Sequence, residues 1–137
     1  MLVAGPGESF GSGVSTAQLA GAVWYFKGTS TGPTTTGSKW WNQNTAGIAD
    51  VPEENDNLGI GLSVANYGKS AHADVAFSAP GESLDDGPGV IEGAGAVHLL
   101  FGSASGPTTT GARFLTQNCA GCPDPAEEND GFGGAIN

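Results

Sequence analysis

Two runs of carboxylates stand out as the residues with the clearest chemical potential. Glu53-Glu54-Asn55-Asp56 recurs later in the chain as Glu127-Glu128-Asn129-Asp130. Paired carboxylates in a cleft can serve as a general acid and base, or as oxygen ligands of calcium. Both runs lie in connections between predicted strands, where a charge cluster is usually solvated. We therefore predict a structural role for them, in which Asp56 and Asp130 form turns.

The two cysteines, Cys119 and Cys122, offer a second kind of chemistry. Such a pair can be a redox centre, half of a zinc site or a local disulfide. Zinc takes four ligands, and the sequence has neither a second cysteine pair nor a histidine nearby. A redox pair needs a helix N-terminus that activates a thiol, whereas this segment has the composition of a loop. A disulfide, free thiols and a metal site remain the alternatives.

A possible nucleophile is Ser30, in the segment Gly28-Thr29-Ser30-Thr31-Gly32. This segment matches the G-x-S-x-G elbow of hydrolases, but that elbow must join a strand to a helix. No helical pattern follows, so we predict a turn at Ser30. The sequence offers no other catalytic arrangement and indicates a protein that is not an enzyme.

Composition limits the elements that can position these residues. The chain has 137 residues, including 24 glycines and 8 prolines, and 38% of its residues are hydrophobic. Glycine costs about 1 kcal/mol relative to alanine inside a helix, so a helical bundle is disfavoured. The hydrophobic fraction still supplies a core. The sequence therefore predicts an all-β fold rich in turns.

Charge limits the partners. Fourteen acidic and four basic side chains give a formal net charge of −10. Such a chain repels phosphate, which disfavours nucleic acids and anionic membranes as partners. No apolar run is long enough to cross a membrane, and the first residues lack the features of a signal peptide. We expect a chain without membrane insertion that is either cytoplasmic or has lost its start.

The sequence repeats itself with an offset of 74 residues. The segment PGES at 6–9 returns at 80–83, and GPTTTG at 32–37 returns at 106–111. Over the whole overlap 26 of 63 aligned positions are identical, without a gap. A fixed period of this kind identifies two copies of one structural unit.

Each copy alternates short β-type stretches with turn residues. The predicted strands of the later copy are 58–64, 74–78, 96–101 and 112–116, and the earlier copy begins with a strand over 2–5. Four strands of five to seven residues indicate an antiparallel meander. The strand beginning at Ala22 is apolar on both faces, which is typical of a sheet packed between two others. Four-stranded sheets repeated in tandem and packed face to face predict the blades of a β-propeller.

Three segments together carry a specific pattern: Gly131-Phe132-Gly133, the APGES at 79–83 and the GAVHLLFG at 95–102. These segments resemble the FG-GAP repeats of integrin α-chains and their bacterial relatives. The resemblance covers essentially the whole chain. It implies a seven-bladed propeller, of which residues 2–56 form a blade without its first strand and residues 57–130 a complete blade. Residues 131–137 would be the first strand of a further blade.

The family often carries a calcium loop between the first two strands of a blade, which aligns here with residues 66–74. Of its acidic positions the loop retains Asn66, has Gly68 and Ser70 at the next two, and keeps Asp74 as its one carboxylate. Calcium needs six to eight oxygen ligands and several carboxylates for tight binding. We therefore expect no metal or other cofactor there. In this hypothesis Lys69 and the local hydrogen bonds of Asn66 and Ser70 replace the ion.

The resemblance implies a non-catalytic binding or adhesion module, extracellular or on the cell surface, whose partner is an unidentified protein or glycan. An extracellular setting favours the disulfide among the alternatives for Cys119 and Cys122. Two blades cannot close a ring, so we expect either a fragment of a longer protein or a unit that assembles with copies of itself. The alternative is an accessory propeller domain of a larger secreted hydrolase. The sequence does not identify the ligand-binding residues.

Overall fold

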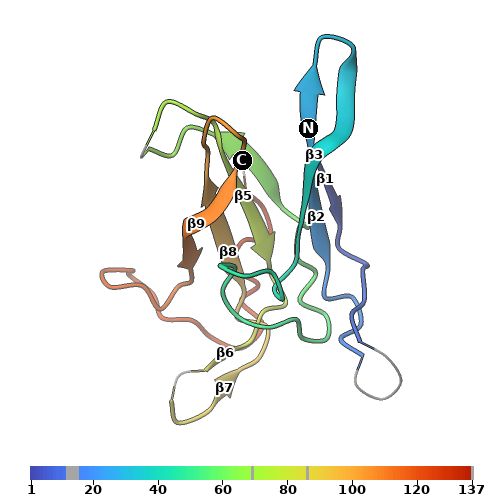
Figure 1. The fold of residues 1–137 in the computed structure, drawn as a ribbon. Coiled ribbons are helices and arrows are strands. Elements are labelled where there is room, and N and C mark those ends of the chain that lie inside the picture. Colours follow the sequence, from blue (N-terminus) through green and yellow to red (C-terminus); the bar gives the residue numbers. More distant parts are fainter. Residues whose placement is uncertain (12–15, 69, 86, 137) are drawn as a thin grey trace.

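The computed structural model describes residues 1–11, 16–68, 70–85 and 87–136, and every regular element within them is a β-strand (Figure 1). The first sheet contains three antiparallel strands in the order β1 (Leu2–Gly5), β2 (Ala22–Thr29) and β3 (Gly32–Trp41). The second sheet contains four antiparallel strands in the order β4 (Leu62–Ala65), β5 (Asp74–Ala79), β8 (Ala96–Phe101) and β9 (Thr108–Leu115). A small hairpin of β6 (Leu84–Asp85) and β7 (Val90–Ile91) lies at one end of the molecule.

The two sheets repeat each other residue by residue. Leu2 pairs with Tyr25 in the first sheet, and the residues 74 positions later, Ala76 and Leu99, pair in the second. The hairpin β2–β3 has a bulge between Tyr25 and Lys27, and β8–β9 has the corresponding bulge between Leu99 and Phe101. The 74-residue offset found in the sequence is therefore also a repeat of strand register.

The repeat extends into the loops that differ most in sequence. The pair Leu84–Ile91 joins β6 to β7, and its equivalent in the first copy is the isolated bridge between Phe10 and Ala17. The predicted turn at Ser30 is present between β2 and β3, where Thr29 Oγ1 donates to the Gly32 carbonyl at 2.6 Å. The equivalent pairings Leu84–Ile91 and Phe10–Ala17 show that the two copies have the same backbone arrangement in these loops.

Strand boundaries differ from the prediction where glycines intervene. The strands at 2–5 and 96–101 are as predicted, and β5 is one residue longer than expected. The strand predicted over 58–64 begins only at Leu62, because the chain first turns, with Ile60 N–H donating to the Asn57 carbonyl at 3.1 Å and Gly59 at a φ of 97°. The strand predicted over 112–116 starts earlier, at Thr108, because the threonine run pairs with β8.

The strand expected over residues 131–137 is not formed by its described residues, 131–136. They make the turn that residues 57–60 make one repeat earlier, with Gly134 N–H donating to the Gly131 carbonyl at 2.9 Å. By the same correspondence the start of β4 at Leu62 falls on Ile136. A strand equivalent to β4 would therefore begin at Ile136, the last described residue.

The core lies between the two sheets, which face each other in Figure 1. Val23 and Trp41 of the first sheet are buried with Val75, Phe77 and Leu100 of the second. The rings of Trp41 and Phe77 stack with centroids 6.4 Å apart. Burying a side chain of this size stabilises the fold by about 2–3 kcal/mol, so packing across this interface fixes how the two repeats sit against each other.

Two equivalent glycines allow the connection from one repeat to the next to approach the sheet. Gly21 has a φ of 86°, and a Cβ there would lie 2.4 Å from the Leu58 nitrogen. Gly95 has a φ of 85°, and a Cβ there would lie 2.3 Å from the Phe132 nitrogen. Leu58 and Phe132 donate to the carbonyls of Ala20 and Ala94, both at 2.9 Å. Each repeat is thus hydrogen-bonded to the start of the next.

Candidate functional site

The loop in which the family resemblance would place calcium is closed by hydrogen bonds to its carboxylate. Asp74 is fully buried at the start of β5. Its Oδ2 accepts from Tyr67 N–H at 2.9 Å, and its Oδ1 accepts from Gly102 N–H at 2.7 Å. Both oxygens of this carboxylate therefore already have donors from the backbone.

Two further polar side chains of the same loop, Asn66 and Ser70, are also engaged in hydrogen bonds. Asn66 Nδ2 donates to the Ser70 carbonyl at 3.0 Å, and Asn66 Oδ1 accepts from Gly68 N–H at 2.9 Å. Ser70 Oγ accepts from His72 N–H at 3.1 Å. The local hydrogen bonds of the metal-free hypothesis are thus present, while Lys69, its other component, lies outside the described residues.

Cys119 and Cys122 are joined in a disulfide, with their Cα atoms 5.3 Å apart. The pair closes a tight turn in the exposed connection after β9, where Cys122 N–H donates to the Cys119 carbonyl at 3.1 Å. The equivalent positions in the first copy are Thr45 and Ile48. The disulfide therefore adds to one copy of the turn and is not a requirement of the repeat.

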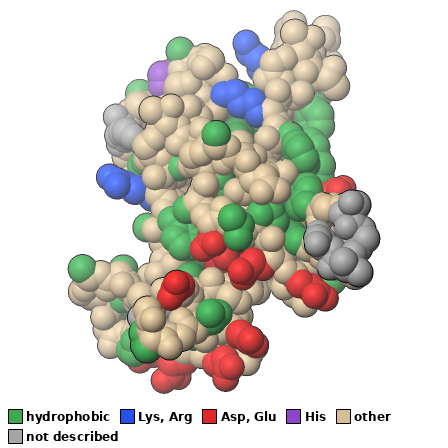
Figure 2. Space-filling view, turned by 60° about the horizontal axis from the view of Figure 1, so that its bottom comes forward, with side chains coloured by type: hydrophobic (Ala, Val, Ile, Leu, Met, Phe, Trp, Pro, Cys, Tyr) green, Lys and Arg blue, Asp and Glu red, His purple; other side chains and the backbone are tan. Residues whose placement is uncertain are grey.

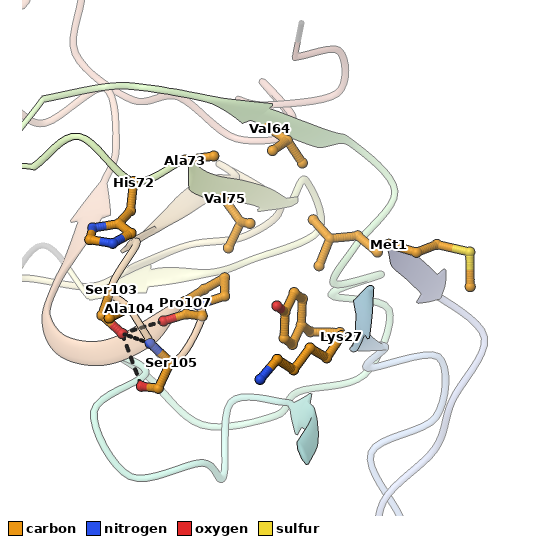
Figure 3. A pocket seen from close by; sticks show the side chains of 13 residues that line it. Met1, Lys27, Val64, His72, Ala73, Val75, Ser103, Ala104, Ser105 and Pro107 are labelled. Atoms are coloured by element: carbon orange, nitrogen blue, oxygen red, sulfur yellow. Dashed lines mark hydrogen bonds between the residues drawn. The ribbon is translucent and has the colours of Figure 1, made fainter. Parts of the chain in front are cut away.

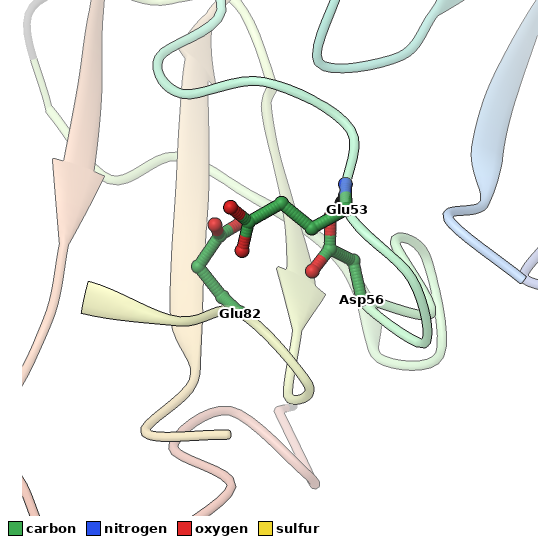
Figure 4. A group of neighbouring side chains, drawn as sticks. All are labelled: Glu53, Asp56 and Glu82. Atoms are coloured by element: carbon green, nitrogen blue, oxygen red, sulfur yellow. Dashed lines mark hydrogen bonds between the residues drawn. The ribbon is translucent and has the colours of Figure 1, made fainter. Parts of the chain in front are cut away.

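A second group of carboxylates forms where the two repeats meet, and the sequence alone did not reveal it. Glu53 and Asp56 come from the connection between β3 and β4, and Glu82 follows the turn at the end of β5. Each offers one oxygen, and these oxygens all lie within 4.8 Å of one another. Figure 4 shows the three side chains converging from these two segments. We call Glu53, Asp56 and Glu82 the carboxylate cluster.

Local backbone geometry sets the positions of the cluster. Asp56 Oδ2 accepts from Glu53 N–H at 2.6 Å, which confirms the turn predicted at Asp56. Gly81 brings Glu82 against this turn, and a Cβ at Gly81 would lie 1.9 Å from the Asn55 carbonyl oxygen. Only a glycine permits this approach. The second copy repeats the turn, with Asp130 Oδ2 accepting from Glu127 N–H at 2.8 Å.

Two of the three carboxylates in the cluster are buried, so the solvated role predicted for the first acidic run is wrong for Asp56. Asp56 and Glu82 are both 0% exposed, whereas Glu53 is exposed. Gln43 is 2% exposed, and its Nε2 donates to Glu82 Oε2. Asp56 Oδ1, Glu82 Oε1 and Gln43 Oε1 are buried without a hydrogen-bond partner among the described residues. The sequence prediction failed here because it treated the loop alone, while the burial comes from the next repeat.

Burial and mutual repulsion both oppose ionisation of the cluster. Desolvation, and then the charge of Asp56, raise the pKa of Glu82 to about 9. Desolvation also raises the pKa of Asp56 to about 6, and the pKa of Glu53 is raised for the same reason. The groups that act on Glu82 by charge are all carboxylates: Asp56, Asp50 and Glu53. The cluster is therefore a site where positive charge, as a proton or a cation, is strongly favoured.

The repeat supplies an internal control for this cluster. Glu8 is the equivalent of Glu82, and Glu127 and Asp130 are the equivalents of Glu53 and Asp56. All three of these residues are exposed. Asp56 and Glu82 are buried, unlike Asp130 and Glu8, where a Glu of one repeat meets the acidic turn of the repeat before it.

An acidic hollow of about 590 Å³ reaches the cluster from solvent at Glu53. Its lining includes Glu54, Asn55, Glu92 and Asn129. Figure 2 shows Asp and Glu side chains gathered at this end of the molecule and Lys and Arg toward the opposite end. On the face that Figure 2 shows, the described acidic and basic side chains therefore lie apart.

The opposite end carries a cleft of about 460 Å³ between the two sheets. Figure 3 shows Met1 and Lys27 on one side of it and His72, Ser105 and Pro107 on the other. Tyr25 and Val75 also line it, so its walls are largely apolar with a cation and hydroxyls at the rim. Both repeats contribute to this cleft.

A further buried titratable group, His98, has a packing role. It is 1% exposed, and its ring lies 5.6 Å from that of Phe77 and 5.1 Å from that of Phe114. Desolvation lowers its pKa to about 4. His98 is therefore neutral at physiological pH and contributes to the aromatic core.

Comparisons with protein-family models, curated proteins and solved structures gave no match to this chain. The described part of the chain also contains no helix with the length and apolar character needed to cross a membrane. The coarse class, an all-β protein built from antiparallel sheets, is established by the strands themselves. Any assignment of the chain to a particular family depends on the sequence motifs and on the repeat geometry.

Proposed function

We propose that the chain is a stretch of an FG-GAP β-propeller that serves as a non-catalytic binding module, extracellular or at the cell surface. One observation carries the proposal: the apolar face through which the first sheet packs on the second is present again on the second sheet. In the first sheet this face consists of Val23, Tyr25 and Trp41. Its equivalent consists of Val97, Leu99 and Leu115.

This second face supports further stacking of sheets. Leu99 and Leu115 line an apolar hollow of about 290 Å³ together with Tyr67 and Ile136. Leu115 is 42% exposed, whereas its equivalent, Trp41, is 3% exposed under the neighbouring sheet. Sheets that each present a complementary pair of faces are the requirement for a propeller. The additional blades would come from a longer chain or from further copies of this one.

The binding role is supported by the cleft between the sheets. It is assembled by both repeats, so it exists only when two blades are packed together. Apolar walls with a few polar groups at the rim are typical of a recognition site. We infer that this cleft, with Tyr25 on its wall and Lys27 and Ser105 at its rim, contacts a protein or glycan ligand.

A binding screen tests this function directly. The wild-type chain is applied to immobilised glycans and extracellular-matrix proteins, beside a variant that carries Lys27→Glu and Ser105→Arg. Both substitutions are at exposed positions, so the fold should persist. Arg113→Glu, at an exposed position of β9, is the control, because it makes the same charge reversal as Lys27→Glu at a residue that does not line the cleft.

We expect saturable binding to at least one component, retained in the Arg113 variant and lost in the cleft variant. No saturable binding by the wild-type chain, or binding that the cleft variant retains in full, would contradict the proposed site and function.

A further inference from the structure

We propose that the carboxylate cluster binds one calcium ion between the two repeats, with the side-chain oxygen of Gln43 as an additional ligand. This inference goes beyond the binding function proposed above and does not depend on it. It also places the ion outside the 66–74 loop, to which the sequence motif points.

The oxygen atoms of the cluster suit a hard cation as ligands. Glu53, Asp56, Glu82 and Gln43 offer only oxygen ligands, of the carboxylate and amide kinds that calcium prefers. Two ligands on opposite sides of calcium, each 2.3–2.6 Å from it, are about 4.6–5.2 Å apart. The three carboxylate oxygens lie within 4.8 Å of one another, so one ion could contact all of them with little rearrangement.

The unpartnered atoms point to a ligand independently of the acidic character of the cluster. Asp56 Oδ1, Glu82 Oε1 and Gln43 Oε1 are all acceptors, all buried and all without a donor among the described residues. Gln43 is held in the cluster because its Nε2 donates to Glu82 Oε2. A proton on Glu82 could satisfy one neighbouring acceptor and would leave another unpaired. A single cation satisfies all three at once.

The charge of the site distinguishes calcium from magnesium. Magnesium usually retains several waters and uses one or two carboxylates. Here three carboxylates and an amide converge, and two of the carboxylates are fully buried in the contact between repeats. Calcium accepts such a crowded and irregular oxygen shell. The acidic hollow borders the cluster at Glu53, the one exposed carboxylate of the three.

Calorimetric titration of the full chain with CaCl₂ at neutral pH tests the site. The informative variants are Glu82→Gln and Asp56→Asn, which retain shape and remove charge. Their matched controls are Glu8→Gln and Asp130→Asn, the same substitutions at the exposed equivalents in the repeat. Glu53→Gln, at an exposed ligand, tests the site even if the buried variants fail to fold. Thermal unfolding in calcium or in chelator provides a second readout.

We expect one ion per chain, with an affinity that falls on the order of a hundredfold in Glu82→Gln and Asp56→Asn and about tenfold in Glu53→Gln. The Glu8 and Asp130 variants should bind as the wild type does. At a calcium concentration near 100 times the dissociation constant, the wild-type Tm should rise by about 10 °C.

Three results would overturn the proposal. One is the absence of any calcium heat in the wild-type chain up to millimolar concentrations. Another is unchanged affinity in Glu82→Gln and in Glu53→Gln. The third is binding that disappears in Asn66→Ala and persists in Glu82→Gln, because that result would place the ion in the 66–74 loop.

Discussion

The 66–74 loop and the carboxylate cluster are both candidates for calcium, and they differ in how their oxygens are used. Asp74 is fully buried, and each of its oxygens accepts from a backbone N–H. Asp56 is equally buried, but only its Oδ2 has a donor among the described residues. The Asp74 carboxylate completes a turn. The Asp56 carboxylate retains one acceptor, Oδ1, that has no donor among the described residues.

The difference shows that burial of a carboxylate is not by itself a sign of a metal site. In the loop, the donors come from residues close in sequence and from the neighbouring β8–β9 hairpin, so the anion has a local structural task. In the cluster, carboxylates from two repeats are brought together, and Asp56 Oδ1 and Glu82 Oε1 have no donor among the described residues. The chemistry arises from the junction between repeats, and no single segment contains it.

Replacing Asp74 tests the structural half of the comparison and should have the largest effect. Asp74→Ala removes the acceptor of Tyr67 N–H and Gly102 N–H and leaves these donors without a partner. We expect a loss of about 3 kcal/mol in the free energy of unfolding. Urea denaturation in calcium and in chelator measures it, and the loss should be the same in both. A loss seen only in calcium would mean that Asp74 binds the ion.

Substituting Gly81 tests the other half of the comparison, because it displaces the carboxylate cluster without changing a proposed calcium ligand. Gly81→Ala places a methyl group within 1.9 Å of the Asn55 carbonyl oxygen, so the turn that carries Asp56 must move away from Glu82. We expect a loss of about 2 kcal/mol in stability, together with weaker calcium binding.

The matched control is Gly7→Ala, the same substitution one repeat earlier. A Cβ at Gly7 would meet nothing closer than a Leu19 side-chain carbon at 4.0 Å. Denaturation and calorimetry on both variants check the prediction. Equal effects at positions 7 and 81 would show that the contact between repeats does not set the cluster.

A third, smaller effect is the pH dependence of folding stability that His98 contributes in the core. It can be measured separately from the pH dependence that the carboxylate cluster contributes. His98 has a folded-state pKa of about 4 against 6.5 as its ordinary value. As the pH falls from 6.5 toward 4, the unfolded chain takes up a proton that the folded chain excludes, so stability decreases by at most about 1.4 kcal/mol per pH unit. Well above pH 6.5 this contribution is constant.

The variant His98→Phe should lack this part of the slope. Phe77 and Phe114, which lie beside His98, carry no charge, and the carboxylates of the cluster titrate in both proteins alike. Between pH 6.5 and 5.5, chemical denaturation should show that the variant loses about 1 kcal/mol less than the wild type. Parallel slopes in the two proteins would contradict the buried, neutral state of His98.

Much of the fold follows from the sequence because the repeat and the strand pattern are local signals. The strand at 96–101 is predicted to the residue, since its apolar run ends at Gly102. The turn at 57–60 is missed because Leu58 and Ile60 have the composition of a strand, while Gly59 adopts a positive φ. Hydrogen bonding of Leu58 to Ala20, in the preceding repeat, decides that conformation.

The candidate site could be predicted only in part. The turn at Asp56 is visible in the sequence because an Asp side chain commonly bonds a nearby backbone N–H. The partnership of Asp56 with Glu82 is not visible, because it depends on how one sheet packs against the next. The available signal was the repetition of Glu after Pro-Gly at Glu8 and Glu82.

The most direct test of the account is to locate the ion in crystals of the wild-type chain grown with CaCl₂. We predict anomalous density for one calcium ion between the repeats, with oxygens of Asp56 and Glu82 at 2.3–2.6 Å from it. Residues 66–74 should retain their hydrogen bonds to Asp74. An ion coordinated by Asp74, or crystals with no ion at the carboxylate cluster at saturating calcium, would contradict the account.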